Sequence, residues 1–164
     1  MAVQKIGCHT LTWGNYFKDY PLKDVLCEIK EAGYEGAEIF DPLPRLGSAS
    51  LLKTQLDEAG LELASLSANV RVTSDERADI AEAMEKAYFA GQFGVEALMV
   101  TGGWKGDGLS KDAKSYKALC KRLDSLAKYS SRFNVKIAFH NHLDTIVEDE
   151  RDIMDLLEFS GSVK

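Results

Sequence analysis

The residues of this chain best suited to chemistry lie in the segment KIAFHNHLDTIVE, residues 136–148. His140 and His142 stand two positions apart, directly after a strand-like apolar run, and Glu148 follows them. Imidazole and carboxylate groups transfer protons and bind metal ions. The alternative is that one histidine caps a loop while the other is solvated. We favour catalytic histidines or metal-binding histidines, because both stand at the end of the predicted strand.

Other candidate site residues are spread along the chain. Glu38 lies among apolar neighbours, so its carboxylate needs a partner, and we predict a histidine across the barrel in that role and a catalytic function. A satisfied hydrogen-bonding strut is the alternative. His9 and Trp13 share one face of the first predicted strand, and Trp104 lies in a glycine-rich loop. We predict all three as substrate contacts, since an indole can support a sugar ring, although Trp13 also suits a core position.

The elements that position these residues follow one repeated pattern. A helix end, a Gly or Asn, and a short apolar run recur in EAGYEGAEIF, EAGLELASLS, FGVEALMVTG and FNVKIAFHNH, residues 31–40, 58–67, 93–102 and 133–142. Gly and Asn tolerate the left-handed conformation that ends a helix, and the apolar runs suit buried parallel strands. With a strand at the N-terminus, the pattern predicts strands near 5–13, 36–40, 62–68, 96–101 and 136–142.

Amphipathic helical stretches separate these strands, which predicts parallel strands joined by right-handed crossovers. A doubly wound sheet and an eight-fold barrel both satisfy this order. The first strand-to-helix loop, HTLTWGNYFKDYP, carries neither GxGxxG nor a phosphate loop, which opposes a nucleotide-binding sheet. We therefore predict the α/β class and a partial TIM (β/α)8 barrel, with about five βα units and parallel strands in sequential order.

The pattern begins again at residues 158–164 and stops where a sixth strand should run. A complete barrel needs ~250 residues. We therefore expect residues 1–164 to form a single incomplete barrel domain, truncated after the fifth βα unit. In its fifth strand, Ala138, His140 and His142 share one face, which we expect to point to the barrel axis and mouth.

Composition excludes several classes of function. Net charge is −6, which opposes binding to a nucleic-acid backbone. No apolar run approaches the ~20 residues that span a bilayer, and the N-terminus lacks the apolar core of a signal peptide. The 3 cysteines form no CxxC pair, which favours a reducing cytoplasm. Three acids near a predicted helix start, Asp75, Glu76 and Asp79, are predicted to be surface charges.

With KIGCHTLTWGNYF, GYEGAEIF and FHNHLDTIVE on strands one, two and five, the chain resembles the sugar phosphate isomerase/epimerase family of xylose isomerase-like TIM barrels. HNHLDTIVE is most similar to the HxHxGTxVE pattern of inosose dehydratase-like members. Asp144 stands where that pattern has Gly, which puts the loop conformation in doubt. The resemblance implies a divalent metal (manganese, magnesium, cobalt or zinc) with Glu148 as a ligand and His140 and His142 as ligands or substrate contacts. The remaining ligands come from later strands, so an incomplete metal site is expected.

The resemblance also implies proton transfer beside a carbonyl, as in a metal-dependent sugar, sugar phosphate or cyclitol isomerase or epimerase. Dehydration of an inosose-type keto-sugar is the first alternative. A non-catalytic half-barrel that assembles through its open strand edges, as a homo-oligomer or with a partner chain, is the second. A DNA-repair endonuclease of the same superfamily is the third, and the acidic charge opposes it. We expect a small sugar substrate, no nucleic acid, no membrane, and little activity from the 164-residue chain alone.

Overall fold

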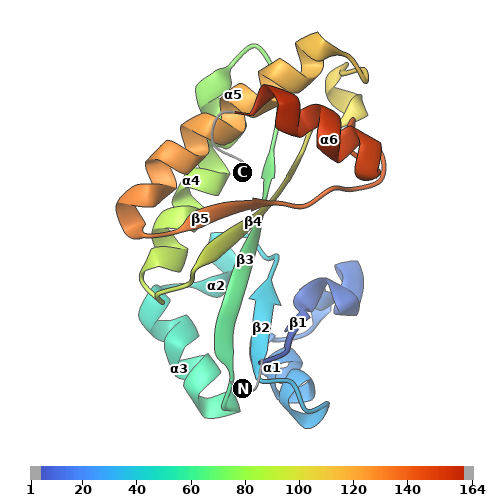
Figure 1. Ribbon diagram of the computed structural model, residues 1–164. Coiled ribbons are helices and arrows are strands. Elements are labelled where there is room, and N and C mark those ends of the chain that lie inside the picture. Colours follow the sequence, from blue (N-terminus) through green and yellow to red (C-terminus); the bar gives the residue numbers. More distant parts are fainter. Residues whose placement is uncertain (1–4, 161–164) are drawn as a thin grey trace. The chain divides into compact units, whose positions relative to one another are not determined.

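The computed structural model describes residues 5–160, without the side chains of residues 15–19. Five strands alternate with helices along this part of the chain (Figure 1). The strands are β1 Gly7–His9, β2 Gly36–Ile39, β3 Glu62–Val70, β4 Ala97–Gly102 and β5 Lys136–Phe139. The helices are α1 Leu22–Glu31, α2 Leu43–Leu46, α3 Ala49–Ala59, α4 Glu76–Gly91, α5 Ala113–Ser130 and α6 Glu150–Phe159. The 3-10 turns are η1 Thr10–Asp19, η2 Lys105–Asp107 and η3 Ser131–Phe133.

The strands form one sheet in the order β1-β2-β3-β4-β5. The pairings of β1 with β2, of β2 with β3 and of β4 with β5 are parallel. This confirms the predicted α/β class with parallel strands in sequential order. Gly60, Gly94 and Asn134 adopt the left-handed conformation, with φ of 68°, 68° and 59°, at the positions where the repeated pattern predicts helix ends.

The chain divides into two compact units, residues 1–67 and 68–164, and β3 crosses the boundary. In the first unit, α1 buries one apolar stripe, made of Leu22, Val25, Leu26 and Ile29, and it packs on α3 and β2. These residues follow the i, i+3, i+4, i+7 spacing of an amphipathic helix. The stripe and the strands beside it therefore form a core within this unit.

In the second unit, α5 packs against α4, α6 and β5. Figure 1 shows α4 and α5 running side by side. The buried face of α5 includes Tyr116, Leu119, Cys120, Leu123 and Leu126. Among residues 5–160, no helix combines the length and the apolar character needed to cross a membrane.

One predicted surface charge is wrong. Asp79 is 5% exposed, and its Oδ2 lies 3.0 Å from Nη2 of Arg122, which is 6% exposed. Thr73 donates two hydrogen bonds to the same carboxylate, from its backbone nitrogen and its hydroxyl. Asp79 turns inward because α5 brings a guanidinium group next to it. A buried charge needs such a partner.

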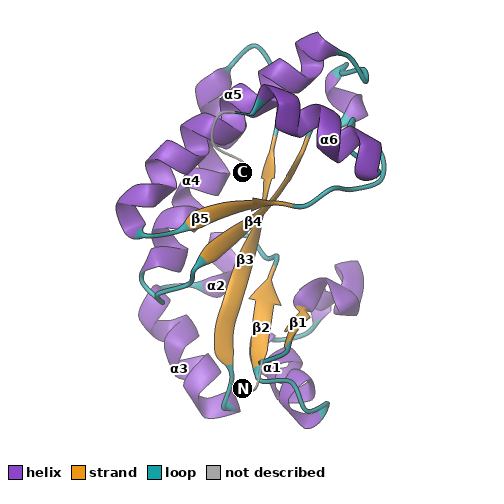
Figure 2. Ribbon diagram, in the orientation of Figure 1, coloured by secondary structure: helices purple, strands orange, loops and turns teal. Residues whose placement is uncertain are grey.

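The strands β1 and β5 are shorter than predicted. In Figure 2 the ribbon that follows β5 is drawn as a loop. β1 ends at His9 instead of residue 13, because the backbone N–H of Leu11 donates to the His9 side chain and the chain turns into η1. β5 ends at Phe139 instead of residue 142. His140 still donates a backbone bond to Val100 of β4 (2.8 Å), but His142 donates to Val147 (3.1 Å). His142 therefore lies in a loop, and it does not continue the strand face of Ala138.

Candidate functional site

Three polar side chains meet near the carboxyl ends of the first three strands, within the first unit. We call His9, Glu38 and Ser67 the strand-end cluster. The parallel register places His9 beside Glu38. Nε2 of His9 lies 3.2 Å from Oγ of Ser67 and 3.4 Å from Oε1 of Glu38. The Ser67 hydroxyl donates to the same carboxylate oxygen. The partner of Glu38 is thus a histidine, as predicted, but it is His9 of the neighbouring strand β1 and does not come from across the barrel.

Backbone geometry decides which nitrogen of His9 carries the proton. The N–H of Leu11 donates to Nδ1 over 2.9 Å, so Nδ1 is an acceptor. The ring proton of neutral His9 therefore sits on Nε2, which faces Ser67 and Glu38. Oε1 of Glu38 therefore lies beside the Ser67 hydroxyl and the His9 ring N–H, whereas Oε2 accepts no hydrogen bond from the side chains and backbone that the structure describes. The side chain of Glu38 is 26% exposed, so solvent and small molecules can reach it.

Trp13 lies in η1, outside the predicted strand. Its indole N–H donates to Oε2 of Glu28 on α1, over 2.7 Å. The polar edge of the ring is therefore committed to a protein carboxylate. A sugar contact through its face stays a prediction.

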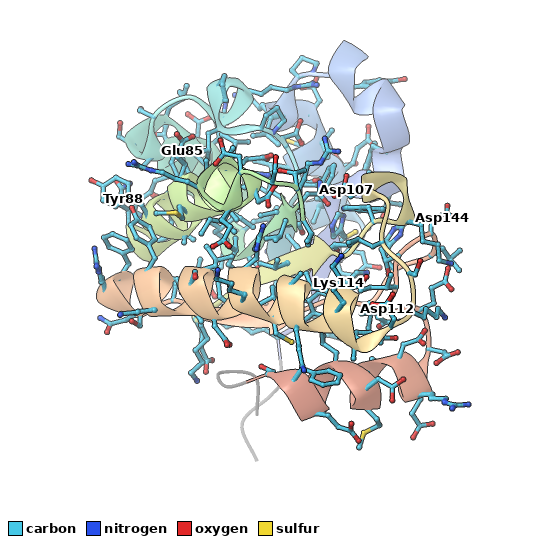
Figure 3. All side chains as sticks on the ribbon, turned by 90° about the horizontal axis from the view of Figure 1, so that it is seen from above. Glu85, Tyr88, Asp107, Asp112, Lys114 and Asp144 are labelled. Atoms are coloured by element: carbon cyan, nitrogen blue, oxygen red, sulfur yellow. The ribbon has the colours of Figure 1, made fainter. Side chains whose placement is uncertain are left out.

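In the second unit, the loops after β4 and β5 approach one another closely. Trp104 and Thr145 form an antiparallel bridge, and the N–H of Ile146 donates to the carbonyl of Gly103 over 2.8 Å. Gly103 has φ +80°, and a Cβ there would lie 2.9 Å from Cγ1 of Ile146. Only glycine satisfies both conditions. In Figure 3, Asp107 and Asp144 of these two loops lie at one end of the unit and Tyr88 lies at the other.

Charged and aromatic side chains gather where these loops meet, and we call them the loop cluster. Its members are Trp104, Lys105, Lys111, His142, Glu148 and Asp152. Oε1 of Glu148 lies 2.8 Å from Nζ of Lys105, and Oε2 lies 3.2 Å from Nζ of Lys111. The hydrogen bonds from Lys105 and then Lys111 lower the pKa of Glu148 from 4.5 to about 2. Glu148 is therefore a carboxylate with two ammonium partners.

Asp152 is the buried carboxylate of the loop cluster. Its side chain is 6% exposed and lies 2.6 Å from Nζ of Lys111. It also accepts the backbone N–H of Glu148 over 2.9 Å. Burial opposes its ionisation, but the hydrogen bonds from Lys111 and the backbone outweigh burial and lower the pKa of Asp152 to about 2. The same hydrogen bond raises the pKa of Lys111.

The roles of Lys111 and Asp152 were not predicted. Asp152 had one local signal, because it stands three residues after Asp149 at a helix start. The two form a capping box in the structure. Lys111 had no such signal, because its partners lie about forty positions away in the sequence.

His142 has the opposite proton arrangement to His9. Its Nδ1 lies 2.8 Å from the carbonyl oxygen of Leu143, and a carbonyl only accepts, so Nδ1 carries the proton. Nε2 then keeps its lone pair. The ring lies against Trp104, with centroids 5.2 Å apart, and 6.1 Å from the ring of His140. Both histidines are exposed. Three predicted site residues, Trp104, His142 and His140, are thus brought together where these loops meet.

Asp144, which stands at the glycine position of the HxHxGTxVE pattern, adopts a backbone conformation that glycine favours. Its φ is +64°, in the left-handed region, which Asp adopts more readily than most residues. Its backbone N–H donates to Oε1 of Glu148 over 3.0 Å. The backbone of this loop therefore has a conformation that either Asp or Gly can adopt.

The residues described do not fit a bound divalent metal. Among residues 5–160, no group of three or more His, Cys, Asp or Glu side chains could hold one. The carboxylate oxygens of Glu148 accept from two lysines, which would repel a second cation. Both carboxylates of the loop cluster, Glu148 and Asp152, are paired with lysines. The cluster therefore offers His140 and His142 no carboxylate that could share a metal ion with them.

Comparison with known proteins places the chain in a family. The model of the xylose isomerase-like TIM barrel family matches residues 26–164, and the chain belongs to this family. It is 30% identical to the rhizopine catabolism protein MocC of Rhizobium meliloti, over 96% of this chain and 53% of that protein. It is 22% identical to inosose dehydratase of Mesomycoplasma hyopneumoniae strain 7448, over 95% and 56%. The chain thus spans about half the length of the curated relatives it matches.

Solved structures show the same fold at low identity. The apo form of 3-keto-D-glucoside 4-epimerase YcjR from E. coli matches with a TM-score of 0.70 and 17% identity, over 95% of this chain and 64% of that one. A xylose isomerase-like TIM barrel protein from Mycobacterium smegmatis, solved in complex with magnesium, matches with a TM-score of 0.67 and 17% identity, over 94% and 60%. These likenesses support a partial TIM barrel.

Proposed function

We propose that this chain is part of a sugar or cyclitol isomerase or epimerase that moves a proton on the carbon beside a carbonyl. The observation that carries the proposal is the strand-end cluster, in which Glu38 is oriented by His9 and Ser67. In barrels of this class, chemistry takes place at the carboxyl ends of the strands. The substrate, as a small sugar, the cytoplasmic location and the single incomplete barrel domain over residues 1–164 belong to the same proposal.

The chemistry assigned to the cluster is general acid–base catalysis. The Nε2–H of His9 donates to the Ser67 hydroxyl, which donates in turn to Oε1 of Glu38, and Oε2 is the atom left to accept a proton from carbon. Return of that proton to the neighbouring carbon gives isomerisation. Epimerisation requires that a second acid, on the opposite face, delivers a proton to the same carbon. His9 and Ser67 act as positioning residues in this scheme. Any change in their hydrogen bonds alters the direction in which Glu38 points.

A second reaction is favoured by the relatives. Inosose dehydratase is similar over nearly the whole chain, and a rhizopine catabolism protein is more similar still. In a dehydration, the same removal of a proton beside a carbonyl is followed by loss of a hydroxyl group as water. The first step is shared, so the role given to Glu38 is the same for both reactions.

The expected divalent metal (manganese, magnesium, cobalt or zinc) remains a proposal for the whole protein. It is supported by the family and by the magnesium complex of the M. smegmatis protein. Its ligands would have to include groups other than the lysine-paired carboxylate of Glu148. The catalytic or ligand roles predicted for His140 and His142, and the sugar contact of Trp104, are likewise proposals, and the free Nε2 of His142 suits either role.

Solvent isotope exchange tests the proposal directly. The whole protein of which this chain is part is incubated in deuterated buffer with inosose and with 3-keto-sugars, and exchange at the carbon beside the carbonyl is followed by NMR. We expect Glu38→Gln to lose exchange by about 100-fold or more, and Ser67→Ala to lose about tenfold, with the fold retained. Glu31→Gln, an exposed carboxylate on α1, is the matched control. Unchanged exchange in Glu38→Gln would remove Glu38 from the mechanism.

A further inference from the structure

Glu148 occupies the position at which the family resemblance implies a metal ligand, but its surroundings are those of an ion-pair centre. We infer that Glu148 is a positioning residue, which locks the loop that carries His142 through Lys105 and Lys111 and does not bind a metal. This inference is independent of the proposed reaction. It concerns which groups hold Glu148 and what Glu148 holds in turn.

Both oxygens of Glu148 are occupied by donors from the protein. Oε1 accepts Nζ of Lys105 (2.8 Å) and the backbone N–H of Asp144 (3.0 Å). Oε2 lies 3.2 Å from Nζ of Lys111. The two ammonium groups already compensate the charges of the Glu148 and Asp152 carboxylates, so an added divalent cation would have to displace a lysine from Glu148. Charge-assisted hydrogen bonds of this kind are about twice as strong as neutral ones.

The two lysines are held to different degrees. Lys111 also lies 2.6 Å from the buried carboxylate of Asp152, so it cannot leave Glu148 without breaking a second ion pair. The Lys105 side chain is 45% exposed and has one carboxylate partner. Lys111 is therefore the fixed anchor of the centre and Lys105 is its outer partner. Both lie on the loop between β4 and α5, whereas Glu148 lies on the loop between β5 and α6, so the centre joins the two loops.

Glu148 also closes the loop that contains His142. The side-chain amide of Asn141 donates to the backbone carbonyl of Glu148 over 2.8 Å, and the Asp144 N–H donates to its carboxylate. The hydroxyl of Thr145 donates to the carbonyl of His142 over 2.7 Å. These bonds hold Asp144 in the left-handed conformation, with φ +64°. Without the Glu148 carboxylate, the Asp144 N–H loses its acceptor and the turn loses a main reason to stay left-handed.

The left-handed turn at Asp144 decides which ring nitrogen of His142 carries the proton. Its Nδ1–H reaches the carbonyl of Leu143, which immediately precedes Asp144, only while this backbone is held in place. A series of contacts therefore runs from Lys111 through Glu148 and Asp144 to the His142 ring. Replacing a residue that acts through these contacts changes the tautomer of His142. Replacing a residue that merely adds stability does not.

Nitrogen-15 NMR of the imidazole rings distinguishes these cases, because the sequence has only 3 histidines. We expect a single dominant Nδ1–H tautomer for His142 in the unchanged protein and the Nε2–H tautomer for His9, which serves as an internal reference. In Glu148→Ala, which removes the acceptor of the Asp144 N–H, His142 should lose its single dominant tautomer, while His9 keeps its own. The exposed Glu150→Ala on α6 should leave both histidines unchanged. An unaltered His142 spectrum in folded Glu148→Ala would overturn the inference.

Calorimetric titration with Mn²⁺ tests the second half of the inference. We expect Glu148→Gln to change the affinity for Mn²⁺ by no more than about twofold, and Lys105→Met to leave it equally unaffected. Stronger Mn²⁺ binding in Lys105→Met would show that Lys105 occupies the place of a metal ion and would overturn the inference. Loss of Mn²⁺ binding in Glu148→Gln would overturn it as well. Lys105→Met removes only the exposed partner, so it remains decisive should Glu148→Gln fail to fold.

Discussion

The ammonium group of Lys105 lies 2.8 Å from Oε1 of Glu148, although the two residues belong to loops that follow different strands. With Lys111 on the other carboxylate oxygen, this pair turns the loops after β4 and β5 into one ionic junction. The junction includes Asp152, which is buried, and it supports the turn that holds His142. Charge, and not only apolar packing, therefore organises this end of the second unit.

The junction predicts how stability depends on acid. The pKa of Glu148 is lowered from 4.5 to about 2, and that of Asp152 from 3.8 to about 2. Because both folded-state values lie below the ordinary ones, their contribution is fully present above pH 4.5 and is lost as the pH falls towards 2. We expect the melting temperature to drop across this window. Glu148→Gln should flatten the drop, whereas Glu150→Gln should not. An equally steep drop in both variants would contradict the assignment.

The buried ion pair of α4 and α5 predicts a large loss of stability. Asp79 and Arg122 are 5% and 6% exposed, and Thr73 completes the hydrogen bonds of the carboxylate. Asp79→Ala leaves a buried guanidinium without its main partner, so the free energy of unfolding should fall by about 3–5 kcal/mol. Urea denaturation measures this. The solvent-facing Asp57→Ala on α3 removes an exposed pair with Lys53 and should lose no more than about 0.5 kcal/mol.

Two glycines in one loop separate backbone strain from crowding. Gly103 has φ +80°, and a Cβ added there would lie only 2.9 Å from Cγ1 of Ile146. Gly108 has φ +79°, but a Cβ added there would meet no atom within 4 Å. Gly108→Ala should lose about 1–2 kcal/mol of stability through strain alone. Gly103→Ala should lose about 1–3 kcal/mol more, because the loops must also separate. Equal losses for the two variants would show that the contact between these loops is loosely packed.

The outer edges of the sheet predict self-association. β1 and β5 stand at the two ends of the strand order, and among residues 5–160 each is paired on one side. Unpaired edges present backbone donors and acceptors to other chains. We expect light scattering to show concentration-dependent oligomers of the 164-residue chain, and Ala138→Pro in β5 to weaken them. A monodisperse monomer with cooperative melting would contradict this prediction.

The sequence by itself determined the order of the elements and the ends of several helices. Left-handed residues such as Gly60 and Asn134, followed by short apolar runs, are local signals, and a helix end depends mainly on its own few residues. The amphipathic stripe of α1 is equally local. The strand order and its parallel pairing followed from these signals, because alternating strands and helices leave few topologies.

Only the tertiary structure decided which side chains meet. Glu38 and Ser67 stand 29 positions apart, and Lys105 and Glu148 stand 43 apart, so no local pattern links them. The end of β5 was also a tertiary decision, since His142 pairs with Val147 instead of continuing beside β4. Asp79 turned inward for the same reason, because Arg122 approaches from another helix. An ionised group adopts the position in which it finds a partner, and that partner is set by the packing of distant elements.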